Sequence, residues 1–296
     1  NRIFEPLWNR DHVRHVHISW SENLSLHGRA GYFDHYGIVR DVMQNHLTQM
    51  LALTAMECPW DMSEHCVRNE KVNLLRHVTP LTRDRVVLGQ YGAGMLEGKS
   101  QRGYLQEPGV PGASRTPTSA AAVFEIRSSR WRGVPFMISA GKGLNCHRTE
   151  IRVQFKAPEF DLFESILDRG DSRGRPSRGN ELIIRVQPDE RINLRIVNKI
   201  PGIGMRLDNP MLDLSYRDTY QGLRINDAYE SLLLDVLRGD RSLFIRDDEL
   251  EASWDFFTPL LHELEATPDR PESYPFGSRR PGQRIALARK FNIEDP

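Results

Sequence analysis

The sequence predicts an α+β fold, in which a large, mostly antiparallel sheet has helices packed on one face. Three observations support this prediction. Most strand patterns come before the later helix patterns, the two do not alternate regularly, and 39% of the 296 residues are hydrophobic, which is enough for a substantial core. Regular alternation of strands and helices would instead predict a parallel sheet.

The first two elements are the clearest. Residues 15–20 alternate polar and apolar side chains, which is the period of a half-buried strand. From Gly37 to Glu57 apolar residues return every three or four positions, which predicts one amphipathic helix ending before Pro59. On an ideal α-helix His46 projects into the apolar stripe and Asp41 lies about 140° away. We therefore expect His46 to point inward and Asp41 to lie on another face.

The remaining elements follow from composition and periodicity. Residues 89–120 are rich in glycine and proline and predict a long loop. Strands are expected at 121–124, 134–138, 151–155, 182–186 and 191–197. Helices are expected at 227–237 and 248–264, and the tail from Pro271 predicts turns. Residues 168–180, rich in Arg and Gly, predict a flexible, solvated insertion.

The charge balance and the absence of common motifs exclude several classes of function. Forty basic and forty acidic side chains give no net positive field, so nucleic acid and anionic membranes are not expected partners. No apolar run approaches the roughly 18 residues of a membrane span. The three cysteines are dispersed, which indicates neither a disulfide framework nor a zinc ribbon. We expect a cytoplasmic protein, with an organelle as the open alternative.

Metal and nucleotide motifs are also incomplete. His15 and His17 have no neighbouring ligand set, so we expect exposed strand histidines and no metal. Gly98-Lys99-Ser100 lacks the first glycine of a phosphate loop, because Ala93 holds that position. The glycine pairs at 92–94 and 202–204 each lack the third glycine of a dinucleotide fingerprint. A classical Rossmann cofactor unit is therefore not expected within this sequence.

A series of short motifs nevertheless runs through nearly the whole chain in a fixed order. It includes residues 21–22 (SE), 28–34 (GRAGYFD), 38–47 (IVRDVMQNHL), 140–142 (AGK), 184–188 (IRVQP) and 274–279 (YPFGSR). Together these motifs resemble the glucose-6-phosphate dehydrogenase family. The resemblance implies one C-terminal substrate and dimerisation domain over residues 1–296, with the family's N-terminal Rossmann domain and its RIDHYLGK segment absent from this chain.

The resemblance also implies roles for individual residues. His46 would take the proton from the C1 hydroxyl of glucose 6-phosphate while hydride passes to NADP, giving the 6-phosphogluconolactone in the first step of the pentose phosphate pathway. An imidazole is a suitable base near pH 7. The substrate-binding positions would be Glu22, Asp41, Lys142, His147 and Gln187. Carboxylates accept hydrogen bonds from sugar hydroxyls and a lysine attracts phosphate, while His147 replaces a basic residue that Arg148 could supply instead.

A second, structural NADP is implied as well. The matching positions are Arg148, Arg152, Arg185, Arg195, Asp213 and Arg279. Guanidinium groups suit phosphates, although the same strand arginines could simply pair with acidic side chains. Ser139 replaces a basic residue of that site, and the aromatic C-terminal tail that stacks on this ligand has no counterpart. Because the family pairs subunits through this sheet, a homodimer or tetramer is expected.

Besides a small-molecule sensor of sugar phosphate or NADP, two interpretations stay open. In the first, the chain is the C-terminal portion of an NADP-dependent glucose-6-phosphate dehydrogenase, with its cofactor domain upstream. In the second, it is a non-catalytic truncated homologue that serves as a structural or interaction subunit of a larger assembly. At the level of residues, His46 could be a hydrogen-bonded core histidine, and Glu22 and Lys142 could be solvated charges.

Overall fold

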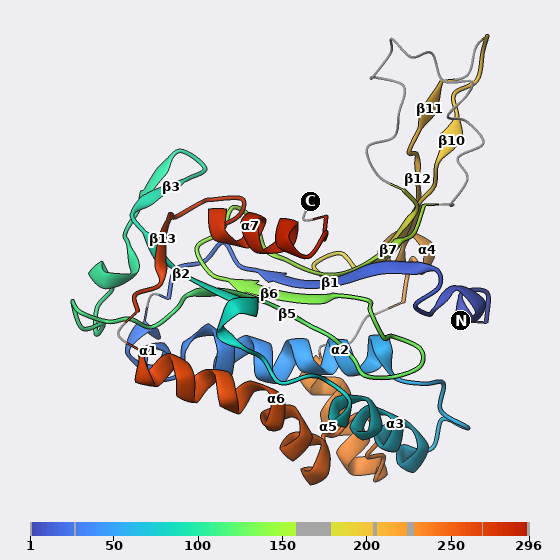
Figure 1. Cartoon of the computed structure of the whole chain (residues 1–296), viewed down its shortest axis with the longest axis horizontal. Coiled ribbons are helices and arrows are strands. Elements are labelled where there is room, and N and C mark those ends of the chain that lie inside the picture. The colour runs from blue at the N-terminus through green and yellow to red at the C-terminus, as the bar shows by residue number, and fades with distance from the viewer. Residues whose placement is uncertain are drawn as a thin grey trace.

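A nine-stranded mixed sheet organises the part of the chain that the computed structural model describes, which is residues 2–26, 28–157, 179–203, 206–223, 228–267 and 269–294 (Figure 1). In chain order its strands are β1 (Val13–Ser21), β2 (Val86–Gly92), β5 (Ser119–Phe124), β6 (Phe136–Gly141), β7 (Arg148–Phe155), β8 (Glu181–Gln187), β9 (Arg191–Arg195), β12 (Met211–Ser215) and β13 (Glu272–Pro275). Two small hairpins add β3 (Gly94–Leu96) with β4 (Lys99–Gln101), and β10 (Asn198–Lys199) with β11 (Leu207–Asp208).

The strand order across the sheet is β12-β9-β8-β7-β1-β6-β5-β2-β13. Neighbours are antiparallel except for the pairs β1–β6 and β2–β13, which are parallel. The predicted α+β class with a mostly antiparallel sheet is therefore confirmed.

The helices expected at 227–237 and 248–264 are present, the one expected at 37–57 differs, and four further helices of the described chain were not predicted. In chain order the helices are α1 (Ala30–Ile38), the π-helix η2 (Val39–Leu47), α2 (Thr48–Ala55), α3 (Glu64–Arg76), α4 (Tyr216–Thr219), α5 (Ala228–Arg238), α6 (Asp247–Ala266) and α7 (Gly282–Lys290), with short 3₁₀ turns η1 (Glu5–Leu7), η3 (Arg83–Arg85) and η4 (Tyr104–Gln106). The single helix predicted from Gly37 to Glu57 is instead a π-helix leading into α2, and Gly37 breaks the backbone before it at φ 66°.

Two sequence predictions about loops were wrong. The stretch 89–120 contains most of β2, both strands of the first hairpin and the start of β5, and the tail from Pro271 contains β13 and α7.

Gly94, at the start of β3, lies where two backbone segments pack closely against each other. A Cβ on Gly94 would lie 2.3 Å from the carbonyl oxygen of Phe276, so a side chain there would clash with the neighbouring backbone. The insertion expected at 168–180 lies outside the described residues except for Gly179 and Asn180.

The main core fills the space between the sheet and the helical layer of α1, η2, α2 and α6 (Figure 1). Alternate strand residues such as Ile18, Ile138 and Val153 face this layer, as the two-residue period of a strand requires. A smaller cluster lies on the opposite face of the sheet, where α7 packs Leu287 against Val123. Burial of each such side chain contributes about 1.5–3 kcal/mol.

His15 and His17 lie on the α7 face of β1, and the prediction that they are exposed was wrong, because both are buried. Their register partners on β7 are Gln154 and Arg152, whose long side chains stand beside them on the same face of the sheet. The Nε2 atom of His17 lies 2.9 Å from the Ser139 hydroxyl. These histidines therefore belong to a buried polar layer.

A buried ion pair joins α3 to α6 of the helical layer. Lys71 Nζ of α3 lies 2.7 Å from Glu249 Oε1 of α6, and both side chains are almost completely buried. Gln49 of α2 donates a hydrogen bond of 2.7 Å to the same carboxylate oxygen. Removing one member of such a pair leaves an uncompensated buried charge, which is strongly destabilising.

We predict that Glu249→Ala lowers the free energy of unfolding by about 3–5 kcal/mol, because Lys71 is left buried without its counter-ion. Urea denaturation followed by circular dichroism measures this change. Glu251→Ala, at an exposed position of the same helix, is the matched control and should change stability by less than about 0.5 kcal/mol. A loss below about 1 kcal/mol in Glu249→Ala would contradict the structural role of the pair.

Candidate functional site

The candidate site is built where two parallel strands end side by side. In the parallel pair β1–β6, Ser21 is opposite Gly141, so the carboxyl ends of both strands meet at the same edge of the sheet. Glu22 follows directly after β1 and Lys142 directly after β6, and the Glu22 amide donates to the Gly141 carbonyl at 2.9 Å. This pairing therefore brings together two charged residues that are 120 positions apart.

Lys142 is held at the centre of the site. Its ammonium lies 2.7 Å from Glu22 Oε2 and 3.7 Å from Asp41 Oδ2 of η2, and 5.5 Å from the ring centre of Phe33. The backbone is fixed as well, because the Tyr274 hydroxyl donates to the Lys142 carbonyl at 2.6 Å. Lys142 is only 8% exposed, so the alternative of a solvated strand-end charge was wrong.

The electrostatics of Glu22 follow from these contacts. Burial raises the pKa of this carboxyl, but the charge and hydrogen bond of Lys142, a hydrogen bond from Trp20 and the charge of His147 lower it, and the net pKa lies below the ordinary value of 4.5. Glu22 is therefore an ionised acceptor at neutral pH. The alternative of an exposed turn acid was also wrong.

His46 is exposed, and the prediction that it points into the core was wrong. The prediction assumed 100° per residue, whereas the segment is a π-helix with wider turns, in which Thr48 N–H bonds to the Met43 carbonyl five residues earlier. Residues between Val39 and His46 are therefore rotated away from their α-helical directions. The imidazole packs against Trp20 instead in a tilted arrangement, with ring centroids 5.2 Å apart and planes inclined by 33°.

Contacts link five residues of the site into one series. Asp41 contacts Lys142, Lys142 contacts Glu22, the Trp20 indole donates to Glu22 Oε1 at 2.9 Å, and the Trp20 ring packs on His46. Sequence reasoning missed Trp20. Its position two residues before Glu22, on the same face of an ending strand, is the signal that could have identified it.

The other two predicted substrate residues lie on the neighbouring strands. Gln187, at the end of β8, and His147, just before β7, both line a cavity of about 580 Å³, together with Asp189, Arg217 and Tyr220. In the sheet Ser21 pairs with Arg148 and Thr149 pairs with Gln187, so this cavity lies at the end of the sheet where Glu22 follows β1. The structure therefore brings the candidate binding residues to one end of the sheet.

Most of the predicted second-nucleotide residues form a separate cluster on β7, β8 and β9. Buried Glu150 pairs with Arg148, Arg152 and Arg185 at 3.5, 3.0 and 3.1 Å. Buried Glu181 pairs with Arg152 and Arg195, both at 3.1 Å. Four guanidinium groups thus share two carboxylates.

The last two predicted residues lie apart from these ion pairs. Asp213 on β12 accepts a hydrogen bond from Asn193 and pairs with Arg191. Arg279 lies exposed on the loop between β13 and α7. The structure therefore unites four of the six predicted residues around buried acids and does not place Arg279 in the same set of ion pairs.

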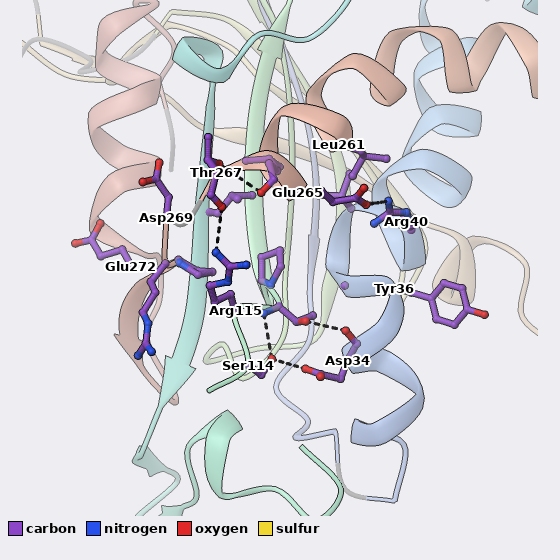
Figure 2. A pocket seen from close by; sticks show the side chains of 18 of the residues that line it. Asp34, Tyr36, Arg40, Ser114, Arg115, Leu261, Glu265, Thr267, Asp269 and Glu272 are labelled. Atoms are coloured by element: carbon purple, nitrogen blue, oxygen red, sulfur yellow. Dashed lines mark hydrogen bonds and ion pairs between the residues drawn. The ribbon is translucent and has the colours of Figure 1, made fainter. Parts of the chain in front are cut away.

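A further cavity of about 370 Å³ lies at the carboxyl end of α6 (Figure 2). Its charges are largely satisfied internally: Arg40 pairs with Glu265 at 2.5 Å, and Arg115 donates to the Thr267 carbonyl at 3.1 Å. Arg40 directly precedes Asp41, so η2 directs two adjacent side chains to different partners. The paired charges of this cavity do not single it out as the catalytic site.

Within the described ranges, no three His, Cys, Asp or Glu side chains are grouped so that they could hold a metal ion. None of the helices in this part of the chain combines the length and the apolar character that crossing a membrane requires.

Comparison with known proteins gives consistent matches. The family model "Glucose-6-phosphate dehydrogenase, C-terminal domain" matches residues 1–294. The chain is 50% identical over 293 residues to the chloroplastic glucose-6-phosphate 1-dehydrogenase of Solanum tuberosum, which covers 99% of this chain and 50% of that protein. It is 47% identical over 293 residues to the glucose-6-phosphate 1-dehydrogenase of Dictyostelium discoideum, covering 99% and 57%. The chain thus spans about half the length of the curated relatives it matches.

Solved structures agree with these relatives. A glucose-6-phosphate dehydrogenase in complex with its substrate glucose-6-phosphate superposes with a TM-score of 0.90 at 39% identity, covering 100% of this chain and 59% of that one. Glucose-6-phosphate 1-dehydrogenase from Mycobacterium avium gives a TM-score of 0.82 at 32% identity, with the same coverage.

We predict that Lys142→Met raises the pKa of Glu22, because the ammonium that lowers this pKa is lost while the burial that raises it persists. Carboxyl ¹³C NMR titration of Glu22 measures the change. Since the folded-state pKa of Glu22 is lowered, the pair stabilises the fold above pH 4.5, and this contribution is lost as the pH falls through the folded-state pKa. The difference in unfolding free energy between the wild type and the variant should therefore shrink at acid pH.

The control for this experiment is Lys290→Met, whose ammonium pairs with exposed Asp84 and not with Glu22. It should leave the titration of Glu22 unchanged. An unchanged pKa of Glu22 in Lys142→Met would show that the ion pair does not set its protonation.

Proposed function

Because the chain belongs to the family of the glucose-6-phosphate dehydrogenase C-terminal domain, we propose that it is the substrate-binding portion of an NADP-dependent glucose-6-phosphate dehydrogenase. The observation that supports this most directly is the position of buried Lys142 between Glu22 and Asp41, with Trp20 linking Glu22 to exposed His46. A buried ammonium is costly unless it is paired, and here its partners are two carboxylates at an accessible edge of the sheet.

The residues of the site divide between binding and proton transfer. Two carboxylates and one ammonium leave a net negative charge and spare acceptor capacity, because an ionised carboxylate has more acceptor sites than one ammonium fills and Asp41 Oδ2 lies 3.7 Å from Lys142. Such oxygens accept hydrogen bonds from sugar hydroxyls. The cavity beside His147 and Gln187 would hold the remainder of the sugar phosphate, with His147 contributing positive charge when it is protonated.

Proton transfer is assigned to His46. Its ring is exposed at the surface of η2, so a sugar hydroxyl can approach a ring nitrogen, and a neutral imidazole takes up a proton from a bound hydroxyl near neutral pH. NADP, when bound by the remainder of the complete enzyme, supplies the acceptor for the hydride. The proposed reaction is oxidation of glucose 6-phosphate at C1.

We also propose that the arginine cluster binds a second NADP. Four guanidinium groups facing Glu150 and Glu181 leave two positive charges in excess, and Arg148 has a side chain that is 43% exposed. Phosphate groups match this chemistry, because guanidinium donors form paired hydrogen bonds to them. The nucleotide would lie over β7 and β8, on the face of the sheet that also carries α7.

Self-association through the sheet is the third proposal. The edge strand β12 exposes Met211, Leu212 and Leu214, and β8 exposes Val186 nearby. An apolar edge strand of this kind can be covered by the same surface of a second copy. We propose a homodimer, or a tetramer built from two such dimers.

We also propose that the protein is located in the cytoplasm. The relatives include chloroplastic and cytoplasmic forms.

We predict that His46→Ala, in the protein expressed from the complete open reading frame, lowers kcat for glucose 6-phosphate by about 10²–10⁴-fold, the usual contribution of a general base. KM should change by less than threefold, because the binding carboxylates and Lys142 are untouched. NADP reduction at 340 nm measures both constants.

His65→Ala, which removes an exposed histidine of α3, is the control and should leave both constants unchanged. If the wild-type protein binds glucose 6-phosphate in calorimetry without reducing NADP, the alternative of a non-catalytic subunit is supported. If it neither binds nor turns over the sugar phosphate, the proposed function is wrong.

We predict that Arg148→Ala weakens binding of NADP to the 296-residue chain by about tenfold, because a charge-assisted contact to phosphate is lost. Calorimetry at two salt concentrations measures the affinity. Arg132→Ala, an exposed arginine between β5 and β6, should leave it unchanged. No detectable binding of NADP by the wild-type chain would instead favour the arginines as partners of Glu150 and Glu181 alone.

A further inference from the structure

Trp20 contacts two residues of the site at once. Its indole Nε1 donates a hydrogen bond of 2.9 Å to Glu22 Oε1, and its ring packs at 5.2 Å against the imidazole of His46. The side chain lies near the end of β1 and is half-buried, so a strand of the central sheet anchors it. Among the described residues, no other side chain is observed both to donate to Glu22 Oε1 and to pack against the His46 ring.

Each contact restrains a group that would otherwise be free to rotate. Glu22 receives the Trp20 donor on Oε1 and the Lys142 ammonium on Oε2, so one donor on β1 and one just after β6 hold both carboxylate oxygens. The exposed imidazole of His46 rests against an aromatic face, which limits the rotamers that it can adopt.

We propose that Trp20 is a positioning residue, which fixes the proton acceptor His46 relative to the sugar-binding carboxylate Glu22. This inference rests on the proposed function of those two residues. A substrate hydroxyl held by Glu22 then meets the imidazole in a defined orientation. Displacement of about 1 Å in such an arrangement can cost about 10²-fold in rate, so a residue that holds both groups affects catalysis without touching the reacting atoms.

The two contacts can be separated by substitution. Trp20→Phe keeps an aromatic face for His46 but removes the donor to Glu22. Trp20→Leu removes both the face and the donor. Trp60→Leu is the matched control, because Trp60 is 95% exposed and lies before α3, away from the site.

The experiment compares kcat and KM for glucose 6-phosphate in the protein expressed from the complete open reading frame. We expect Trp20→Phe to raise KM about tenfold, the loss that one hydrogen bond to a charged group produces, with kcat within twofold of the wild type. We expect Trp20→Leu to raise KM similarly and also to lower kcat at least tenfold. Trp60→Leu should change neither constant.

A spectroscopic measurement on the 296-residue chain tests the contacts without turnover. The ring current of Trp20 should shift the imidazole proton resonances of His46 in ¹H–¹³C NMR spectra. This shift should persist in part in Trp20→Phe and disappear in Trp20→Leu. Should Trp20→Leu fail to fold, Trp20→Phe still tests the hydrogen bond to Glu22 through KM.

The outcomes separate this inference from the proposed function. The positioning role would be overturned if kcat and KM stayed within twofold of the wild type in both Trp20 variants. It would also be overturned if the imidazole resonances of His46 in the wild type showed no ring-current shift. A wild-type protein that does not oxidise glucose 6-phosphate would overturn the proposed function instead. In that case the binding of glucose 6-phosphate to the Trp20 variants, measured by calorimetry, decides whether the indole positions Glu22.

Discussion

The ion pair between Lys142 and Glu22 is the interaction on which the site depends. It exists because β1 and β6 are parallel neighbours in a sheet that is otherwise mostly antiparallel, so both strands end at one edge. An antiparallel pairing would have placed Glu22 and Lys142 at opposite ends of the sheet. The pair lowers the pKa of Glu22 and ties Asp41 of η2 to the sheet.

The π-helix is the second determinant of the site. A regular α-helix would have placed His46 among the apolar side chains, which is what periodicity predicted. Wider turns expose the imidazole while Val42, Met43 and Leu47 still reach the core. Buried polar contacts support this irregular segment, because Gln44 donates to the Ser253 hydroxyl of α6 at 2.9 Å. Sequence periodicity cannot reveal the change from four- to five-residue hydrogen bonding, because tertiary contacts of this kind stabilise it.

Local patterns predicted the fold class, the strands with apolar alternation and helices α5 and α6, because each of these elements has a clear period. They failed where composition conflicts with packing. Gly94 resembles a loop residue but admits the backbone of Phe276, and His15 and His17 resemble surface residues but are buried on the face of the sheet that carries α7. The roles of Glu22, Lys142 and His46 came from the family resemblance, since no local pattern brings together residues so far apart in sequence.

The late position of Tyr274 in the chain affects when the site can form during synthesis on the ribosome. Its hydroxyl donates to the carbonyl of Lys142 and contacts Thr118, and its strand β13 is paired with β2, more than 170 positions earlier. The α6 residues that contact η2 and α2 also come late in the chain. A nascent polypeptide therefore cannot complete the contacts around Lys142 until nearly all of the described chain has emerged from the exit tunnel. Until then its unpaired strands expose edges and apolar side chains of the kind that promote aggregation.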